Sequence, residues 1–335
     1  MKILLTGGTG YIGSHAAVAL VEAGHQVVLL DNLSNSQVAV LDRLERILGH
    51  RVPFVEADIR DTDTMIRTMR DHAVDAVMHF AGLKAVGESV KEPINYYANN
   101  VQGSISLLQA MDACDVRTMV FSSSATVYGD PQYLPLDEHH PTSVTNPYGR
   151  SKLHIEEILS DVAQSNDKWN FVCLRYFNPV GAPASGLIGE RPNGIPNILM
   201  PYIAQVAHGE RPYLSVFGDD YNTPDGTGVR DYIHVVDLVD GHLAALEFAQ
   251  NHSGWHAINL GTGKGSSVLD MVQAFAKASG KDVPYQIMPR RSGDVASCYA
   301  KPDKAAEVLG WTAKKSIDDM CSSTWRWQES EQSSS

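Results

Sequence analysis

Tyr148 and Lys152 are four residues apart in the segment Pro-Tyr-Gly-Arg-Ser-Lys, residues 147–152. On a helix this spacing places both side chains on one face, one turn apart. A phenol, with an ordinary pKa near 10, is a poor base, but a close positive charge lowers that pKa by about 1 to 3 units. Such a pair can take a proton from a hydroxyl group. Because Tyr-x-x-x-Lys also occurs by chance, the rest of the chain must decide.

Composition limits the classes of function. At 335 residues and 43% hydrophobic content, the chain can form one large or two modest folded domains. The net charge of -12, without clustered Lys and Arg, argues against a broad nucleic-acid surface. Residues 1–6 are too short for a signal peptide and no later stretch could span a bilayer, so we expect a soluble, cytoplasmic protein. Four scattered cysteines predict neither disulfides nor a metal site: Cys114, Cys173, Cys298 and Cys321.

A glycine-rich turn follows the first apolar run. Lys2–Thr6 leads into Gly7–Gly13 and then into a helical pattern, which predicts a strand, a tight turn and a helix whose N-terminus can bind a pyrophosphate. A second apolar run, Val27–Leu30, is closed by Asp31. A carboxylate there accepts hydrogen bonds from a ribose and repels a 2'-phosphate, which favours NAD over NADP. The alternative is a plain turn residue at the end of a strand.

Strand and helix patterns then alternate, with helices at 38–48 and 62–71, strands at 52–56 and 73–79, one long helix at 93–113 and a strand at 117–121. This alternation predicts an α/β fold with a doubly wound parallel sheet, whose ligands bind at the carboxyl ends of the strands. His79 is expected to be a structural, hydrogen-bonded histidine. The strand at 117–121 brings Ser124 towards Tyr148, whose helix is expected to begin at Asn146 or Pro147.

The second half has a different composition. After a strand at 172–176, residues 178–196 are rich in Gly and Pro, so we place a domain boundary near residue 177. The remainder is expected to be a smaller α+β part, with helices at 199–208 and 268–279 and a strand at 257–260. Part of residues 228–260 can pack back on the first domain. Residues 329–335 are polar and expected to be frayed.

Four segments carry a resemblance to a known family: Phe80–Ser89 (FAGLKAVGES), Ser122–Gly129 (SSSATVYG), Arg175–Gly181 (RYFNPVG) and Asp225–His234 (DGTGVRDYIH). With the glycine turn, Asp31 and the Tyr148–Lys152 pair, the chain resembles the extended short-chain dehydrogenase/reductase family, in its branch that epimerises UDP-hexoses at C4. The resemblance covers residues 2 to 328. It implies an NAD-binding Rossmann domain over residues 1–176 and a UDP-sugar domain over residues 177–335.

The family implies interconversion of UDP-glucose and UDP-galactose by oxidation and re-reduction at C4. In that chemistry Tyr148 takes the proton of the 4-hydroxyl group while NAD accepts the hydride. Lys152, with the positive nicotinamide, lowers the pKa of Tyr148 and holds the ribose, and Ser124 bridges the 4-oxygen and the phenol. The family also implies a homodimer formed through helices 93–113 and 148–162.

The resemblance further implies two sets of binding residues. The cofactor set is Gly7, Gly10, Tyr11, Ile12, Gly13, Asp31, Asn32, Asn35, Ser36, Asp58, Ile59, Phe80, Ala81, Gly82, Lys84, Asn99, Ser122, Tyr148, Lys152, Tyr176 and Phe177. The substrate set is Lys84, Ser124, Ala125, Thr126, Tyr148, Asn178, Asn197, Leu199, Phe217, Arg230, Tyr232, Arg291, Asp294 and Cys298. Arg230 and Arg291 are expected to bind the diphosphate, because guanidinium groups match phosphate oxygens.

Two alternatives remain. A nucleotide-sugar 4,6-dehydratase carries an acidic pair where this chain has Ala125 and Thr126, which cannot act as acid or base in an elimination. A catalytically silent dinucleotide sensor would not need Ser124, Tyr148 and Lys152, all of which are present.

The chain departs from the family pattern at two positions. Ile198 replaces the second of two usual asparagines, which removes one side-chain hydrogen bond unless Asn197 replaces it. Cys298 stands where glucose- and galactose-restricted members resemble one another in having tyrosine. A smaller side chain leaves room for an acetamido group, so we expect UDP-GlcNAc and UDP-GalNAc to be substrates as well. A one-residue shift in this loop would instead place Tyr299 in the pocket.

Overall fold

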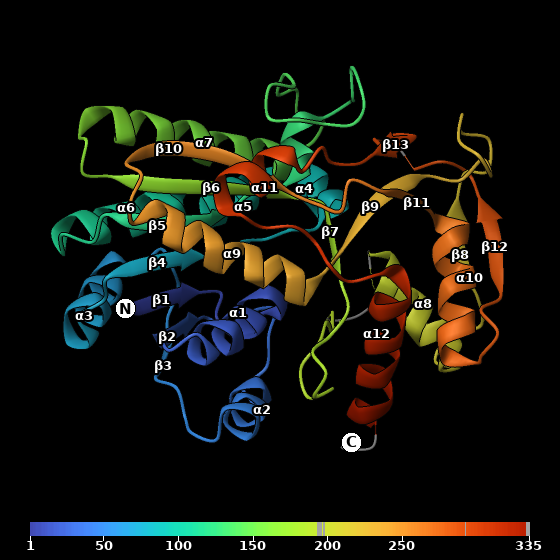
Figure 1. Cartoon of the computed structure of the whole chain (residues 1–335), viewed down its shortest axis with the longest axis horizontal. Coiled ribbons are helices and arrows are strands. Elements are labelled where there is room, and N and C mark those ends of the chain that lie inside the picture. Colours follow the sequence, from blue (N-terminus) through green and yellow to red (C-terminus); the bar gives the residue numbers. More distant parts are fainter. Residues whose placement is uncertain (193–195, 197, 292, 333–335) are drawn as a thin grey trace.

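The computed structural model describes residues 1–192, 196, 198–291 and 293–332. A larger part, built on a parallel sheet, contains the N-terminus, and a smaller part with β8, β12, α8, α10 and α12 lies beside it (Figure 1). Within the described ranges, no helix combines the length and apolar character needed to cross a membrane.

The larger sheet has seven parallel strands in the order β10-β6-β5-β4-β1-β2-β3. The strands are β1 (Lys2–Thr6), β2 (Gln26–Asp31), β3 (Phe54–Glu56), β4 (Ala76–His79), β5 (Thr118–Ser122), β6 (Asn170–Tyr176) and β10 (Gly254–Leu260). The predicted doubly wound parallel sheet is confirmed. The strand order reverses between β1 and β4, and ligands of such sheets bind at this point, beyond the carboxyl ends of the strands.

Alternating apolar residues divide the core into two layers. In β1, Ile3 and Leu5 face one layer of helices and Leu4 faces the other, as the period of two along a strand requires. The first layer is α1 (Tyr11–Glu22), α2 (Ala39–Leu48), α9 (Val235–Ala249) and α11 (Asp303–Leu309). The second is α3 (Thr62–His72), α6 (Gln102–Ala113) and α7 (Pro147–Ser165), with α4 (Val86–Lys91) beside α7.

The helix predicted over residues 93–113 is not one continuous α-helix. It consists of α5 (Pro93–Tyr96), a π-helical turn (Tyr97–Val101) and α6. A π-helical turn holds an extra residue, so it rotates the side chains that precede it relative to those that follow. The apolar residues of 93–113 therefore do not share one buried face: Met111 is buried in the core, whereas Ile94 is 83% exposed.

β10 joins the larger sheet although it comes from the second half of the sequence. It pairs in parallel with β6 over its whole length, from Gly254 opposite Asn170 to Leu260 opposite Tyr176. The strand expected at 257–260 within the smaller part is therefore the edge strand of the larger sheet. We propose a domain boundary near residue 177, with α9 and β10 returning to the first domain.

The smaller part contains two short sheets and three helices. One sheet joins β7 (Asn178–Val180), β9 (Val229–His234), β11 (Gly265–Ser267) and β13 (Ser297–Cys298), and the other joins β8 (Leu214–Phe217) and β12 (Tyr285–Met288). The helices are α8 (Leu199–Ala207), α10 (Val268–Ser279) and α12 (Ile317–Gln332). Their apolar residues form a separate core that includes Ile203, Val216 and Phe275.

The C-terminal segment is ordered further than the sequence predicted. The expected fraying from residue 329 is wrong as far as residue 332, because α12 continues to Gln332. The buried carboxylate of Glu331 lies 3.0 Å from Arg43 on α2 and 2.8 Å from Arg191. Two ion pairs with separate parts of the chain thus hold this end of the helix. Residues 333–335 lie outside the described part.

Candidate active site

The glycine turn after β1 forms a tight backbone cradle. Gly7 has a φ of +69°, and a Cβ atom there would lie 2.7 Å from the backbone nitrogen of Ala81. A Cβ atom on Gly13 would lie 2.1 Å from the carbonyl oxygen of Gly7. Only glycine fits these positions, and the N-terminus of α1 consequently lies against the turn. The cradle lets a pyrophosphate approach the backbone closely, so these residues fit a dinucleotide.

Asp31 ends β2 beside this turn. Its carboxylate accepts hydrogen bonds from the backbone nitrogens of Thr9 (3.2 Å) and Leu33 (2.9 Å) and from the hydroxyl of Ser36 (3.3 Å). A carboxylate fixed in this position fits the ribose of NAD and disfavours the 2'-phosphate of NADP.

Asp58, which follows β3, lies at the same edge of the sheet. Arg60 donates to it at 2.7 Å and lowers the pKa of its carboxyl group to about 2, and Asn32 donates to it at 3.2 Å. Two predicted cofactor residues, Asn32 after β2 and Asp58 after β3, therefore lie side by side.

α7 positions the two residues with which the sequence analysis began. Asn146 caps the helix by accepting a hydrogen bond from the backbone nitrogen of Gly149 (2.8 Å), and Pro147 occupies the first helical position, as predicted. Tyr148 and Lys152 therefore lie on successive turns of one face. The ammonium group of Lys152 is buried, donates to the carbonyl oxygen of Ser122 (2.7 Å) and lies 4.8 Å from the ring centre of Phe121.

In the protein alone, the phenol of Tyr148 is a weaker acid than an ordinary phenol. Burial raises the pKa of its phenol, and two groups act in the opposite direction, the hydroxyl of Ser124 and the positive charge of Lys84. Lys152 instead binds the carbonyl of Ser122, and burial lowers its own pKa to about 8. A lowering of the Tyr148 pKa by Lys152 together with a bound nicotinamide stays a prediction; in the protein alone, burial outweighs the nearby groups and raises this pKa.

Lys84 has a partner that the sequence analysis missed. Its ammonium group lies 2.8 Å from a carboxylate oxygen of Glu190, in the segment that follows β7. The two residues are 106 positions apart, and neither lies in a periodic pattern that would have paired them. The ion pair joins the two halves of the chain next to Tyr148.

Several substrate candidates meet on β9. Asn178 pairs with Tyr232, and Cys298 pairs with Arg230, so these four side chains belong to one small sheet. The guanidinium group of Arg230 donates to the backbone carbonyl of Val229 (2.9 Å).

The remaining basic candidate, Arg291, lies by the two-stranded sheet. Its guanidinium group is 2.9 Å from Asp294 and 4.8 Å from the ring centre of Phe217. Arg291 thus contacts two other predicted substrate residues, Asp294 and Phe217. Leu199 is the first residue of α8, Ile198 caps that helix, and the predicted residue Asn197 lies outside the described residues.

Cys298 packs against a small apolar cluster that includes Ala125 and Phe177, both in the predicted sets. Burial raises the pKa of its thiol to about 11. The ring of Tyr299 lies elsewhere, since a Cβ atom on Gly265 would be 3.1 Å from its Cδ1 atom. Cys298, rather than Tyr299, is the side chain that packs against this cluster.

Most of the predicted cofactor residues lie at one edge of the sheet. They follow the carboxyl ends of six adjacent parallel strands, from β3 to β6 across the sheet. The hydroxyls of Ser122 and Tyr176 contact each other across β5 and β6. Asn99 lies in the π-helical turn and donates to the side chain of Asn100 (3.0 Å). His79 is hydrogen-bonded to Thr6 and Ser104, which confirms its structural role.

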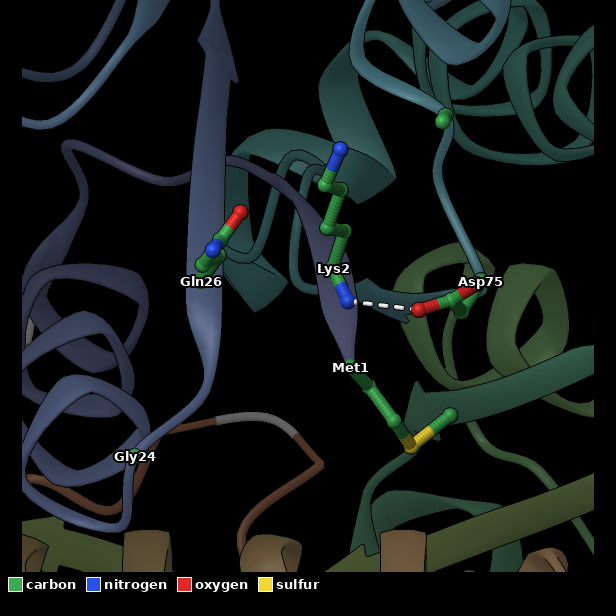
Figure 2. A pocket seen from close by; sticks show the side chains of 6 residues that line it. Met1, Lys2, Gly24, Gln26 and Asp75 are labelled. Atoms are coloured by element: carbon green, nitrogen blue, oxygen red, sulfur yellow. Dashed lines mark hydrogen bonds between the residues drawn. The ribbon is translucent and has the colours of Figure 1, made fainter.

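The opposite edge of the sheet carries an open hollow of about 390 Å³, lined by Met1, Lys2, Gly24, Gln26, Ala73 and Asp75 (Figure 2). The backbone nitrogen of Lys2 donates to Asp75 there (2.7 Å). This hollow lies at the amino ends of the strands, whereas ligands of doubly wound sheets bind at the carboxyl ends. We therefore place the site at the carboxyl edge. In the described part of the chain, no group of three His, Cys, Asp or Glu side chains could hold a metal ion.

Comparison with known proteins identifies close relatives. Residues 3–261 match the model of the NAD dependent epimerase/dehydratase family. UDP-glucose 4-epimerase of Mus musculus is 57% identical, over 98% of this chain and 96% of that protein, and that of Bacillus subtilis is 55% identical, over 98% and 97%. A crystal structure of UDP-glucose 4-epimerase from Stenotrophomonas maltophila, with bound NAD and formylated UDP-arabinopyranose, has a TM-score of 0.98 at 51% identity and covers 100% of both chains. The enzyme from Bifidobacterium longum, in complex with NAD+ and UDP, has a TM-score of 0.96 at 50% identity, over 99% of both chains.

Proposed function

This chain belongs to the NAD dependent epimerase/dehydratase family, and we propose that it is an isomerase that interconverts UDP-glucose and UDP-galactose. The observation that carries this assignment is the meeting of Ser124, Tyr148 and Lys152 at the carboxyl edge of the sheet, beside the glycine cradle. Relatives named UDP-glucose 4-epimerase match this chain over nearly its whole length, which supports the same assignment.

The glycine cradle and Asp31 would hold NAD, which would supply hydride transfer to and from C4 of the sugar. Tyr148 takes the proton from the 4-hydroxyl group and later gives it back. The hydroxyl of Ser124 is hydrogen-bonded to the phenol of Tyr148 and holds the 4-oxygen of the sugar in line with that phenol. The hydrogen bond from Lys152 to the carbonyl of Ser122 holds the ammonium group in one position during both half-reactions.

The dehydratase alternative lacks its acid and base. Ala125 is buried, and the hydroxyl of Thr126 donates to Ser124 (3.0 Å), so the positions of the acidic pair hold a methyl group and an engaged hydroxyl. Epimerisation needs neither acid and is the better supported reaction.

The uridine diphosphate would bind between β9 and the segment that carries Arg291. Arg230 and Arg291 supply positive charge for the two phosphates, and Phe217 and Tyr232 supply aromatic surface for the base. The ion pair of Arg291 with Asp294 and its contact with Phe217 support this role, because they bring the charge and the ring together.

We further propose that UDP-GlcNAc and UDP-GalNAc are substrates. The small side chain of Cys298 packs against the apolar cluster that contains Ala125 and Phe177, whereas Tyr299 lies by Gly265. A tyrosine at position 298 would fill the space that an acetamido group requires.

The protein is proposed to act as a cytoplasmic homodimer. Four apolar side chains on α4, α5 and α6 are exposed: Val86, Val90, Ile94 and Ile105. Such a patch on neighbouring helices is typical of an interface, and it adjoins α7. The four free cysteine thiols fit a reducing compartment.

Purified protein should be assayed with UDP-glucose, UDP-galactose and both N-acetylated sugars, and the released cofactor identified by mass spectrometry. We expect interconversion within each pair and NAD rather than NADP. Formation of a 4-keto-6-deoxy sugar would instead support the dehydratase alternative. Bound NAD without turnover of any of the four sugars would support the silent sensor.

A further inference from the structure

A buried ion pair lies behind the catalytic residues, and no step of the proposed reaction uses it. The side chains of Glu156 on α7 and Arg175 on β6 are 1% and 5% exposed. Arg175 donates to both carboxylate oxygens, through Nη2 to Oε2 (2.6 Å) and through Nε to Oε1 (3.0 Å). Replacing a buried ion pair by packed apolar residues is often neutral or stabilising, so stability alone does not explain why these charges are present.

Glu156 is also joined to the segment that carries the serines. The hydroxyl of Ser123 donates to its Oε1 atom. Ser123 lies between Ser122, whose carbonyl accepts the hydrogen bond from Lys152, and Ser124, which acts on Tyr148. The carboxylate of Glu156 therefore holds Ser123, which lies between the two serines that contact Lys152 and Tyr148.

Arg175 extends this network to two further elements. Its Nη1 atom donates to the phenol of Tyr128 (3.2 Å), which in turn donates to the side chain of Asn259 on β10 (2.6 Å). The guanidinium group is thus held by Glu156 on α7 and by Tyr128 in the 3₁₀ turn Ala125–Tyr128, and Tyr128 is held in turn by the edge strand. A carboxylate bound to such a group has little freedom to move.

Glu156 lies four residues after Lys152, one turn further along α7. The other groups near Lys152 carry no negative charge. His79 on β4 is neutral, because burial lowers its pKa to about 3, and burial raises the pKa of the Cys173 thiol on β6 well above its ordinary value. Burial also lowers the pKa of Lys152, and Glu156 is the first group that opposes this effect.

On the remaining sides Lys152 faces uncharged or positive groups. β5 presents the ring of Phe121 and the carbonyl of Ser122, and β6 presents Arg175 beyond Glu156. Tyr148 lies one turn earlier on α7 and is protonated in the resting protein, because burial raises its pKa. Among the described ionisable groups around Lys152, the carboxylate of Glu156 is thus the one whose negative charge favours the ammonium form.

We propose that Glu156 is a positioning residue for the reaction: held by Arg175, it fixes the Ser122–Ser124 segment through Ser123 and keeps the Lys152 ammonium group charged. The proposal rests on the proposed function. An ordinary structural ion pair would not change the charge of Lys152, whereas a positioning role of Glu156 predicts that it does.

The test compares kcat/KM across pH for the wild type, Glu156→Gln, Glu156→Asp and Ser123→Ala. The Gln variant removes the charge and should move the alkaline limb of the profile to lower pH by about one unit, since Lys152 then loses its proton more easily. The Asp variant keeps the negative charge, so its alkaline limb should lie at the same pH as that of the wild type. Ser123→Ala removes one hydrogen bond without a change of charge, so its limb should stay in place while kcat falls.

The charge of Lys152 should also be measured without turnover, by competitive labelling with acetic anhydride and mass spectrometry across pH. As the pH is raised, labelling of Lys152 should begin at a lower pH in Glu156→Gln than in the wild type. If Glu156→Gln does not fold, the variant Glu156→Gln/Arg175→Gln leaves no unpaired buried charge and should show the same direction of shift. Unchanged limbs and labelling in a folded variant overturn the proposal. A wild-type protein without epimerase activity refutes the proposed function instead, and the labelling comparison still decides the effect of Glu156 on Lys152.

Discussion

The ammonium group of Lys84 lies 2.8 Å from the carboxylate of Glu190, and its positive charge acts on the phenol of Tyr148. The side chain of Lys84 is 49% exposed, so the ion pair contributes only about 0 to 1 kcal/mol to the free energy of unfolding. The ion pair matters instead for the chemistry of the site, because Lys84 and Glu190 together set the net charge beside Tyr148, the proposed base.

Changing either partner should therefore move the limb of the kcat/KM profile that reports the ionisation of Tyr148, and in opposite directions. Lys84→Met removes the charge that lowers the pKa of Tyr148, so the limb should move to higher pH. Glu190→Gln leaves that charge unneutralised, so the limb should move to lower pH. Both profiles should be measured with saturating NAD, because Lys84 is also a predicted cofactor residue. Shifts in the same direction would contradict this account.

Tyr148→Phe should reduce kcat by about 10²- to 10⁴-fold, the usual contribution of a positioned general base. The protein should still bind NAD, since the glycine cradle and Asp31 are unchanged. Epimerisation is measured in a coupled assay, and bound NAD by mass spectrometry of the released cofactor. Turnover within two-fold of the wild type would remove Tyr148 from the mechanism.

Cys298→Tyr should reduce turnover of UDP-GlcNAc and UDP-GalNAc while turnover of UDP-glucose and UDP-galactose is retained. The added ring would occupy the space next to Ala125 and Phe177. Cys298→Ala is the matched control, because it removes the thiol without adding volume, and it should keep both activities. Unchanged N-acetyl turnover in the tyrosine variant would sink the proposed dual specificity.

Ile94→Asp should convert the proposed dimer to a monomer in light scattering, because it places a charge at the most exposed of the four apolar side chains on α4, α5 and α6. Val38→Asp is a suitable control. Val38 is also exposed but lies before α2, away from the patch, so this variant should remain dimeric. A wild type that is already monomeric at micromolar concentration would contradict the assembly itself.

Stability should fall as the pH decreases below about 6.5. Burial lowers the pKa of His79 to about 3 and those of His15 and His242 to about 4, whereas in the unfolded chain the value is near 6.5. Below pH 6.5 the unfolded state binds protons that the folded state excludes, which costs about 1.4 kcal/mol per pH unit for each histidine until the folded pKa is reached.

The measurement is the urea midpoint between pH 7.5 and 5. His79→Gln should show a shallower decline than the wild type, whereas the exposed His139→Gln should follow the wild type. An identical slope for His79→Gln would show that protonation of His79 does not drive the loss of stability.

The parts of the fold that follow from local patterns could be predicted from the sequence. The strand, glycine turn and helix over residues 2–23 and the capped start of α7 are recorded in the order and type of neighbouring residues. For the same reason Tyr148 and Lys152 could be recognised, since one helix fixes their relative position. Asp31 could be placed because it ends a strand of the sheet.

The features that escaped prediction depend on contacts between distant segments or on small changes in backbone geometry. The pair of Lys84 with Glu190, and the contact of Ser123 with Glu156, join residues that no period relates. The π-helical turn at Tyr97–Val101 leaves the sequence pattern of a helix intact while it rotates the apolar face. The pKa of Tyr148 depends on how deeply the phenol is buried, which spacing along the chain does not reveal.

The pairing of β10 with β6 has a consequence for biosynthesis. β6 ends at Tyr176, but its neighbour on the open side is complete only at Leu260, roughly 80 residues later. At a translation rate of about 5 to 20 residues per second, the nascent chain would present an unpaired strand edge for roughly 4 to 16 seconds. During that interval the edge of β6 is open to incorrect pairing. Ribosome-bound chains ended before residue 254 should therefore be more dependent on chaperones than chains ended after residue 260.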